Sequence, residues 1–83
     1  MQTVRVHART ILGDAERSLQ IAPRTPTGEV ALSFANAFQL PVNVPWGLRD
    51  DAAGMFLDDS TAIGTYVTDG ELKTVVTPKA HLG

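Results

Sequence analysis

One short stretch of helical periodicity constrains the fold of this 83-residue chain more than any other feature. Between Glu29 and Gln39 the large apolar residues Val30, Phe34 and Phe38 recur every four positions, with polar residues between them. This spacing puts the three side chains on one stripe of a helix. We therefore predict a single amphipathic helix over residues 29–39, and the rest of the chain has to cover its apolar stripe.

Local signals mark both ends of this helix. Thr25 is a suitable N-cap because its hydroxyl can bond a free backbone amide, and Pro26 suits the first helical position. Pro41 and Pro45 lack the backbone amide that a helix needs, so they stop it and stiffen the loop over residues 40–45.

The two segments before the helix, residues 3–10 and 17–22, have a period of two, which is typical of half-buried strands. Their alternating apolar residues are Val4, Val6, Ala8, Leu19 and Ile21. Gly13 and Asp14 between the segments favour a turn, since Gly tolerates a positive φ and Asp bonds its own backbone. We expect an N-terminal β-hairpin.

Three more strands are predicted after the helix, over residues 46–50, 55–57 and 71–76. A connection over residues 58–67 contains two candidate core residues, Ile63 and Tyr66, and Asp59-Ser60 could cap a single helical turn there. The predicted turns lie at residues 51–54 and at Asp69-Gly70. Strands that pack on one helix make a two-layer α+β domain, and the length allows one such domain.

Composition excludes several classes of protein. The chain has no cysteine, which rules out disulfides, thiolate zinc sites and thiol catalysis and fits a reducing, cytoplasmic compartment. The formal net charge of -2 argues against nucleic acid as a partner, because phosphate binding needs a basic face. No apolar run approaches the roughly 18 residues of a membrane span, and the first residues do not read as a signal peptide.

The residues that could carry catalysis or bind a metal do not converge in the sequence. His7 points with Arg5 and Arg9 toward the solvated face of the first strand, and His81 lies in the tail. The pairs Asp50-Asp51 and Asp58-Asp59 sit in turns, where Asp makes local hydrogen bonds. The serines have neither a nucleophile-elbow context nor a histidine close by in sequence. They are Ser18, Ser33 and Ser60. We therefore predict no enzyme, no metal site and no cofactor.

Three segments carry a resemblance to a known family. Residues 1–6 look like the first strand of the ubiquitin-like β-grasp family, including the Met-Gln opening. The sequence Ala-Gly-x-x-Leu-Asp-Asp at residues 53–59, followed by Thr61, Tyr66 and Val67, resembles the turn between strands three and four and the segment after it. Residues 72–76 resemble the last strand. The resemblance implies a β-grasp roll, a mixed sheet of four to five strands on one helix, with residues 1–76 as the domain and 77–83 as a flexible conjugation tail.

What the resemblance implies for function is a protein modifier. A ubiquitin-activating-type enzyme would adenylate the carboxylate of Gly83, and the acyl group would pass to an enzyme thiol and then to a lysine of a target protein. Lys79, Ala80, His81 and Leu82 would be the tail that these enzymes recognise. The implied partners are the adenylating enzyme, a conjugating enzyme, a JAB-type protease and the target proteins.

Departures from ubiquitin itself point to one branch of the family. The tail ends in a single glycine, only Lys73 and Lys79 are available as lysine acceptors, and the chain is rich in Ala and Thr. These traits look like those of bacterial ubiquitin-like modifiers. Two other functions remain open: a non-conjugated β-grasp docking module similar to type VII secretion accessory proteins, and a sulfur carrier with a thiocarboxylate on Gly83. Gly83 can also be read as a mere chain end.

The sequence also suggests a surface for protein contacts. The apolar loop around Trp46 and the low fraction of charged residues, 19%, leave apolar surface that can pack against a neighbour. Arg49 stands in the third strand, where the apolar recognition patch of ubiquitin is centred. The candidate interaction residues are Leu40, Val42, Val44, Trp46 and Arg49. Unpaired strand edges are a second route, so we expect a homo-oligomer or a filament.

Overall fold

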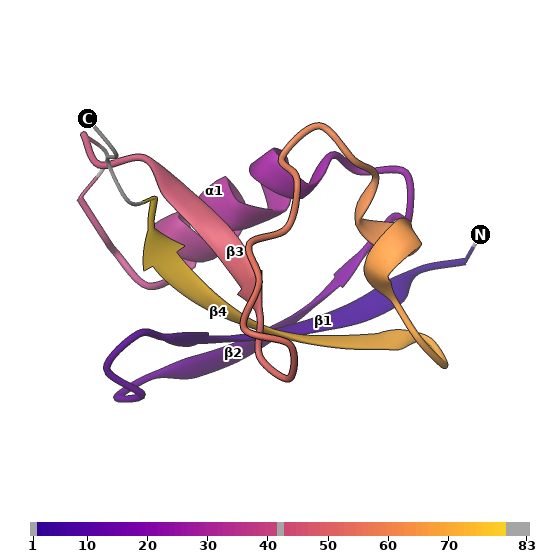
Figure 1. Cartoon of the computed structure of the whole chain (residues 1–83), viewed down its shortest axis with the longest axis horizontal. Coiled ribbons are helices and arrows are strands. Elements are labelled where there is room, and N and C mark those ends of the chain that lie inside the picture. The colour runs from indigo at the N-terminus through magenta and orange to yellow at the C-terminus, as the bar shows by residue number, and fades with distance from the viewer. Residues whose placement is uncertain (1, 42, 80–83) are drawn as a thin grey trace.

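A computed structural model describes residues 2–41 and 43–79 of the chain (Figure 1). Four strands form one sheet in the order β2-β1-β4-β3, and helix α1 lies across one face of it. The elements in chain order are β1 (Val4–Thr10), β2 (Glu16–Ile21), α1 (Thr27–Ala37), β3 (Trp46–Asp50), the 3₁₀ helix η1 (Ile63–Tyr66) and β4 (Glu71–Pro78). The predicted two-layer α+β architecture is confirmed.

The sheet is mixed because the first and last strands run side by side in its centre. β1 and β2 form the predicted antiparallel hairpin, in which Val6 pairs with Leu19. β1 pairs with β4 in parallel, and β3 pairs with β4 antiparallel. Gly13 lies in the hairpin turn with a φ of 73°, a left-handed conformation that glycine adopts without steric cost.

The core fills the space between the sheet and α1. Val30 and Phe34 of the predicted stripe are fully buried, and Phe38 stacks on Phe34 with ring centroids 6.2 Å apart. The sheet contributes buried side chains from β1, β3 and β4, which are Val6, Ala8, Leu48, Leu72 and Val76. Ile63 of η1 is buried as predicted. Among the described residues, no helix is long and apolar enough to cross a membrane.

Both ends of α1 differ from the prediction. The helix begins at Thr27, one residue after Pro26, which the sequence places at the first helical position, and Thr25 is not its cap: Pro26 stands at the N-cap position and its side chain makes no capping hydrogen bond. The reason is the segment after β3, which crosses the start of the helix. Its Thr61 carbonyl accepts hydrogen bonds from the Thr27 amide (2.9 Å) and from the buried Thr27 hydroxyl (2.6 Å). Tertiary contacts thus replace the predicted local cap.

The helix also ends earlier than predicted, at Ala37 rather than Gln39. Gln39 has a φ of 59°, and the amide of Leu40 donates to the Ala35 carbonyl at 2.9 Å. This is the hydrogen-bond pattern of a left-handed helix stop, so the chain leaves the helix before it reaches Pro41.

The predicted strand over residues 55–57 is wrong. Phe56 forms only an isolated bridge with Arg49 of β3. The Leu57 amide also donates a hydrogen bond to the Leu48 carbonyl, and the returning segment then turns away from β3. The helical turn predicted at Asp59-Ser60 is also displaced: η1 begins at Ile63, while the Asp58 carboxylate accepts a hydrogen bond from the Ser60 amide in a local turn. The segment bends here because it must reach across the start of α1.

Candidate functional site

The predicted tail begins inside the sheet. β4 runs to Pro78, so Thr77 and Pro78, which the sequence assigns to the tail, belong to the last strand, and Thr77 is buried. The next amide, that of Lys79, donates to the carbonyl of Pro45 at 2.9 Å. The loop before β3 therefore holds the backbone at the point where the chain leaves the sheet.

The side chain of Lys79 is held as well. Its ammonium pairs with the Asp59 carboxylate. Its aliphatic stem lies over Gly47 in β3, where an added Cβ would stand 3.2 Å from Lys79 Cε and 3.4 Å from the ring of Phe56. Glycine at position 47 leaves the room that the stem occupies. Exposed ion pairs of this kind contribute about 0–1 kcal/mol, so the contact orients the chain more than it stabilises the fold.

The remaining residues of the predicted tail site lie outside the described part of the chain. They are the recognition residues Ala80, His81 and Leu82 and the conjugation residue Gly83. Of the predicted tail site, the structure therefore places Lys79 alone, at the end of β4 and against Asp59.

The candidate interaction residues do not form one surface. Leu40 and Trp46 are half-buried and pack against the core, and the Trp46 indole donates to the Pro41 carbonyl at 2.8 Å. Val44 is half-buried too, whereas Val42 lies outside the described residues. Arg49 faces the opposite side of the sheet from Trp46, because side chains alternate along β3. The structure thus separates Arg49 from the apolar loop.

The outer face of the sheet, away from α1, carries polar side chains joined across strands. Arg9 on β1 pairs with Asp51 at 2.8 Å, just beyond the end of β3. β4 lies between β1 and β3, and its Val75 is fully buried, with Arg9 and Arg49 as its cross-strand neighbours. The Nε atom of Arg49 is buried and has no hydrogen-bond partner among the described residues. This face is therefore polar at its surface with one apolar residue beneath.

A second set of side chains on the outer face joins a hydroxyl, an imidazole and a carboxylate. Nδ1 of His7 lies 2.5 Å from Oγ of Ser18, and Nε2 of His7 lies 2.8 Å from Oε1 of Glu71. Strand pairing brings His7 and Ser18 together, since the two residues stand directly opposite each other in the β1–β2 register. The hydrogen bond from His7 holds the pKa of the Glu71 carboxyl below its usual value, so this carboxylate is ionised at neutral pH.

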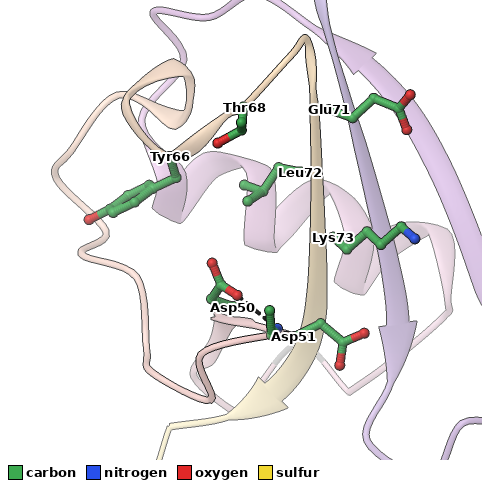
Figure 2. A pocket seen from close by; sticks show the side chains of 8 residues that line it. Asp50, Asp51, Tyr66, Thr68, Glu71, Leu72 and Lys73 are labelled. Atoms are coloured by element: carbon green, nitrogen blue, oxygen red, sulfur yellow. Dashed lines mark hydrogen bonds between the residues drawn. The ribbon is translucent and has the colours of Figure 1, made fainter.

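A surface hollow of about 280 Å³ opens on the other side of β4, beside Tyr66 and Leu72. Figure 2 shows Glu71 and Lys73 pointing away from it, toward the outer face. Asp50 also lines the hollow, but its Oδ1 accepts hydrogen bonds from the amides of residues 52 and 53 at 2.8 and 2.9 Å. These bonds confirm the predicted turn. Within residues 2–41 and 43–79, no group of three or more acidic or histidine side chains is arranged to hold a metal ion.

The arrangement of strands and helix can be compared with known proteins. No protein-family model matches the chain, and no curated protein matches it in sequence. Among solved structures, the ubiquitin of Caldiarchaeum subterraneum superposes with a TM-score of 0.74 at 20% identity, over 98% of this chain and 99% of that one. This chain has the ubiquitin-like fold.

Two further structures share the ubiquitin-like fold. The UBL domain of Plasmodium falciparum Dsk2 gives a TM-score of 0.67 at 20% identity, covering 92% of this chain and all of that one (100%). A chain solved in work on molecular mimicry of SUMO that promotes DNA repair gives 0.74 at 12% identity, covering 93% and 92% of the two chains. The ubiquitin-like β-grasp resemblance that the sequence carries is therefore confirmed at the level of fold.

Within this ubiquitin-like fold, the contact between Ser18 and His7 is the feature that sequence reasoning missed. Eleven positions separate the two residues, so a search for a histidine near each serine in sequence passes over them. The hairpin register contains the signal. With a turn near Gly13-Asp14, position 7 falls opposite position 18, as observed.

Proposed function

We propose that this chain is a ubiquitin-like protein modifier that is joined to target proteins through Gly83. The supporting observation is the way in which the chain leaves the sheet: β4 lies between β1 and β3, ends at Pro78, and passes directly to a Lys79 held by Pro45 and Asp59. A domain whose last strand is paired on both sides is suited to presenting the segment after Lys79 to an enzyme.

The proposed chemistry takes place on other enzymes. The Gly83 carboxylate attacks the α-phosphate of ATP and releases pyrophosphate, which gives an acyl-adenylate. An enzyme thiolate displaces AMP to form a thioester, and the amine of a target lysine displaces the thiolate to form an isopeptide bond. Glycine is suited to this end of the chain because a residue with no side chain leaves the carbonyl open to attack.

The finer parts of the proposal concern partners and setting. We place the protein in the cytoplasm of a bacterium, with an adenylating enzyme, a conjugating enzyme and a JAB-type protease as its partners. The ubiquitin of Caldiarchaeum subterraneum, which covers nearly the same length, supports the modifier class through its fold.

Trypsin provides a direct test in the cells that encode the protein. Cleavage after Lys79 leaves the four residues Ala80–Gly83 attached to any target lysine, so conjugates produce peptides with an Ala-His-Leu-Gly branch. We expect such branched peptides in digests of cells that express the wild-type chain and none when Gly83 is deleted. A matched control, Gly54→Asn, changes an exposed glycine at a φ of 71° that Asn tolerates, and it should preserve the branches.

Other outcomes would identify the alternatives. A thiocarboxylate at Gly83 without branched peptides would indicate a sulfur carrier. An intact, unmodified chain in stable complexes would indicate a docking module. Either result would overturn the conjugation proposal.

Self-association is a separate part of the proposal. β2 and β3 are the two edges of the sheet, and an edge strand can pair with a second copy of the chain. Light scattering at rising protein concentration should show growth beyond a monomer. A constant monomer mass over the whole range would overturn this part alone.

A further inference from the structure

Ser18, His7 and Glu71 form a continuous hydrogen-bonded series across three neighbouring strands. Ser18 is exposed on β2, His7 is half-buried on β1, and Glu71 is exposed on β4. The two contacts of the imidazole, 2.5 Å to the hydroxyl and 2.8 Å to the carboxylate, use both of its ring nitrogens. A hydroxyl, a base and an acid that orients the base are the three parts of an activated nucleophile.

The directions of the two hydrogen bonds follow from what each group can donate. An ionised carboxylate only accepts hydrogen bonds, so Nε2 of His7 carries the hydrogen that faces Glu71. In the neutral imidazole Nδ1 is then the acceptor, and the hydroxyl of Ser18 donates to it. The lone pair of the base is thus aimed at the proton that a nucleophilic Ser18 must lose.

We propose that Ser18 is an activated nucleophile that accepts acyl groups from activated esters. In the step, Oγ of Ser18 bonds to the acyl carbon while His7 Nδ1 takes the hydroxyl proton. The bond between the acyl carbon and the leaving oxygen breaks, the alkoxide or phenolate departs, and the proton passes from His7 to it or to water. A hollow of about 250 Å³ lined by His7, Arg9 and Lys73, among others, gives a small acyl donor room beside the imidazole.

The other two serines of the chain are internal controls for Ser18. Ser60 is exposed and its hydroxyl donates to the Asp58 carboxylate at 2.8 Å, but hydrogen bonds from the Ser60 amide and hydroxyl lower the pKa of Asp58, which makes it a weak base. Ser33 is exposed on α1, outside the outer face of the sheet. Among the three hydroxyls, the one on Ser18 alone contacts an imidazole within the described residues.

The test is acetylation of the full chain with p-nitrophenyl acetate at pH 7.5, followed by tryptic mapping. The three serines fall on three different tryptic peptides, which are Ser18–Arg24, Thr25–Arg49 and Asp50–Lys73. A positioned general base is worth about 10²–10⁴-fold, and the exposure of this site to water lowers that gain. We expect Ser18 to be acetylated at least about tenfold faster than Ser33 and Ser60. Equal rates at the three serines would overturn the proposal.

Variants separate the roles of the base and of the acid that positions it. His7→Gln should reduce the rate at Ser18 to that of Ser33. Glu71→Gln should slow it, and Glu71→Asp, which restores the charge, should recover it in part; a purely structural role would not depend on charge. Asp69→Asn, which removes an exposed carboxylate in the turn before β4 at a φ of 55° that Asn tolerates, is the matched control and should change nothing. An unchanged rate in folded His7→Gln or Glu71→Gln would contradict the assignment.

Discussion

The two faces of the sheet differ in the interactions that their side chains make. On the inner face the side chains of Val6, Leu48 and Val76 are at most 1% exposed and pack under α1. On the outer face the contacts are hydrogen bonds and ion pairs across strands, such as those of Arg9 with Asp51 and of His7 with Glu71. Burying a large apolar side chain contributes about 1.5–3 kcal/mol, whereas an exposed ion pair contributes about 0–1 kcal/mol. The inner face therefore determines whether the chain folds, and the outer face is free to carry chemistry.

The largest expected effect comes from a substitution that disrupts the packing of the inner face. Phe34→Ala removes a ring that is fully buried in the centre of the core, and the loss of burial together with the cavity should lower the free energy of unfolding by about 3–5 kcal/mol. Urea denaturation measures it. Leu32→Ala on the same helix is the control, because Leu32 is 57% exposed and its truncation should cost less than about 0.5 kcal/mol. Similar losses for the two variants would contradict the contrast between packed and exposed residues.

An intermediate effect tests whether the outer face is polar throughout. Val75 points to that face yet is fully buried between its neighbours Arg9 and Arg49. Val75→Ala removes two buried methyl groups and should cost about 2 kcal/mol in urea denaturation. Gln20→Ala, an exposed change on the same face, should stay within about 0.5 kcal/mol. A Val75→Ala variant as stable as wild type would show that the outer face contributes no apolar packing.

The smallest effect is a pH dependence that arises on the outer face. Because the hydrogen bond from His7 holds the folded pKa of Glu71 below its unfolded pKa, its contribution to stability is present above the unfolded pKa and is lost as the pH falls through the folded pKa. Between pH 7 and pH 3 the urea midpoint of the wild type should fall slightly more than that of Glu71→Gln. A difference between the two proteins that stays the same at both pH values would contradict this linkage.

The sequence predicted the inner face better than the segments that cross it. Val30 and Phe34 were identified as core residues because helical spacing depends only on local order, and the same holds for the alternating residues of β1. The cap of α1 differs from the prediction because the carbonyl of Thr61, 34 positions from Thr27, replaces the local cap. The bridge at Phe56 was mistaken for a strand because three apolar residues in a row do not reveal where the chain bends away.

The functional residues also differ in whether their contacts can be predicted from local sequence. Lys79 could be assigned to the tail from sequence, but its contacts with Asp59 and Gly47 depend on how β3 and β4 pair. The contact of Ser18 with His7 was predictable in principle from the hairpin register, whereas Glu71 is brought to His7 by a parallel pairing over 64 positions. Contacts within a hairpin can be read from local spacing, and contacts made by a parallel crossover cannot.

The parallel pairing of β1 with β4 has a mechanical consequence. A force that pulls on the end of β4 against the start of β1 acts along both strands, so the hydrogen bonds from Arg5–Glu71 to Thr10–Val76 are loaded in shear and must yield together. The β1–β2 hairpin would instead open from its free end, one bond at a time, if its strands were drawn apart. A protein pulled at the end of β4 while the start of β1 is held would therefore resist unfolding more strongly than one pulled apart across the β1–β2 hairpin.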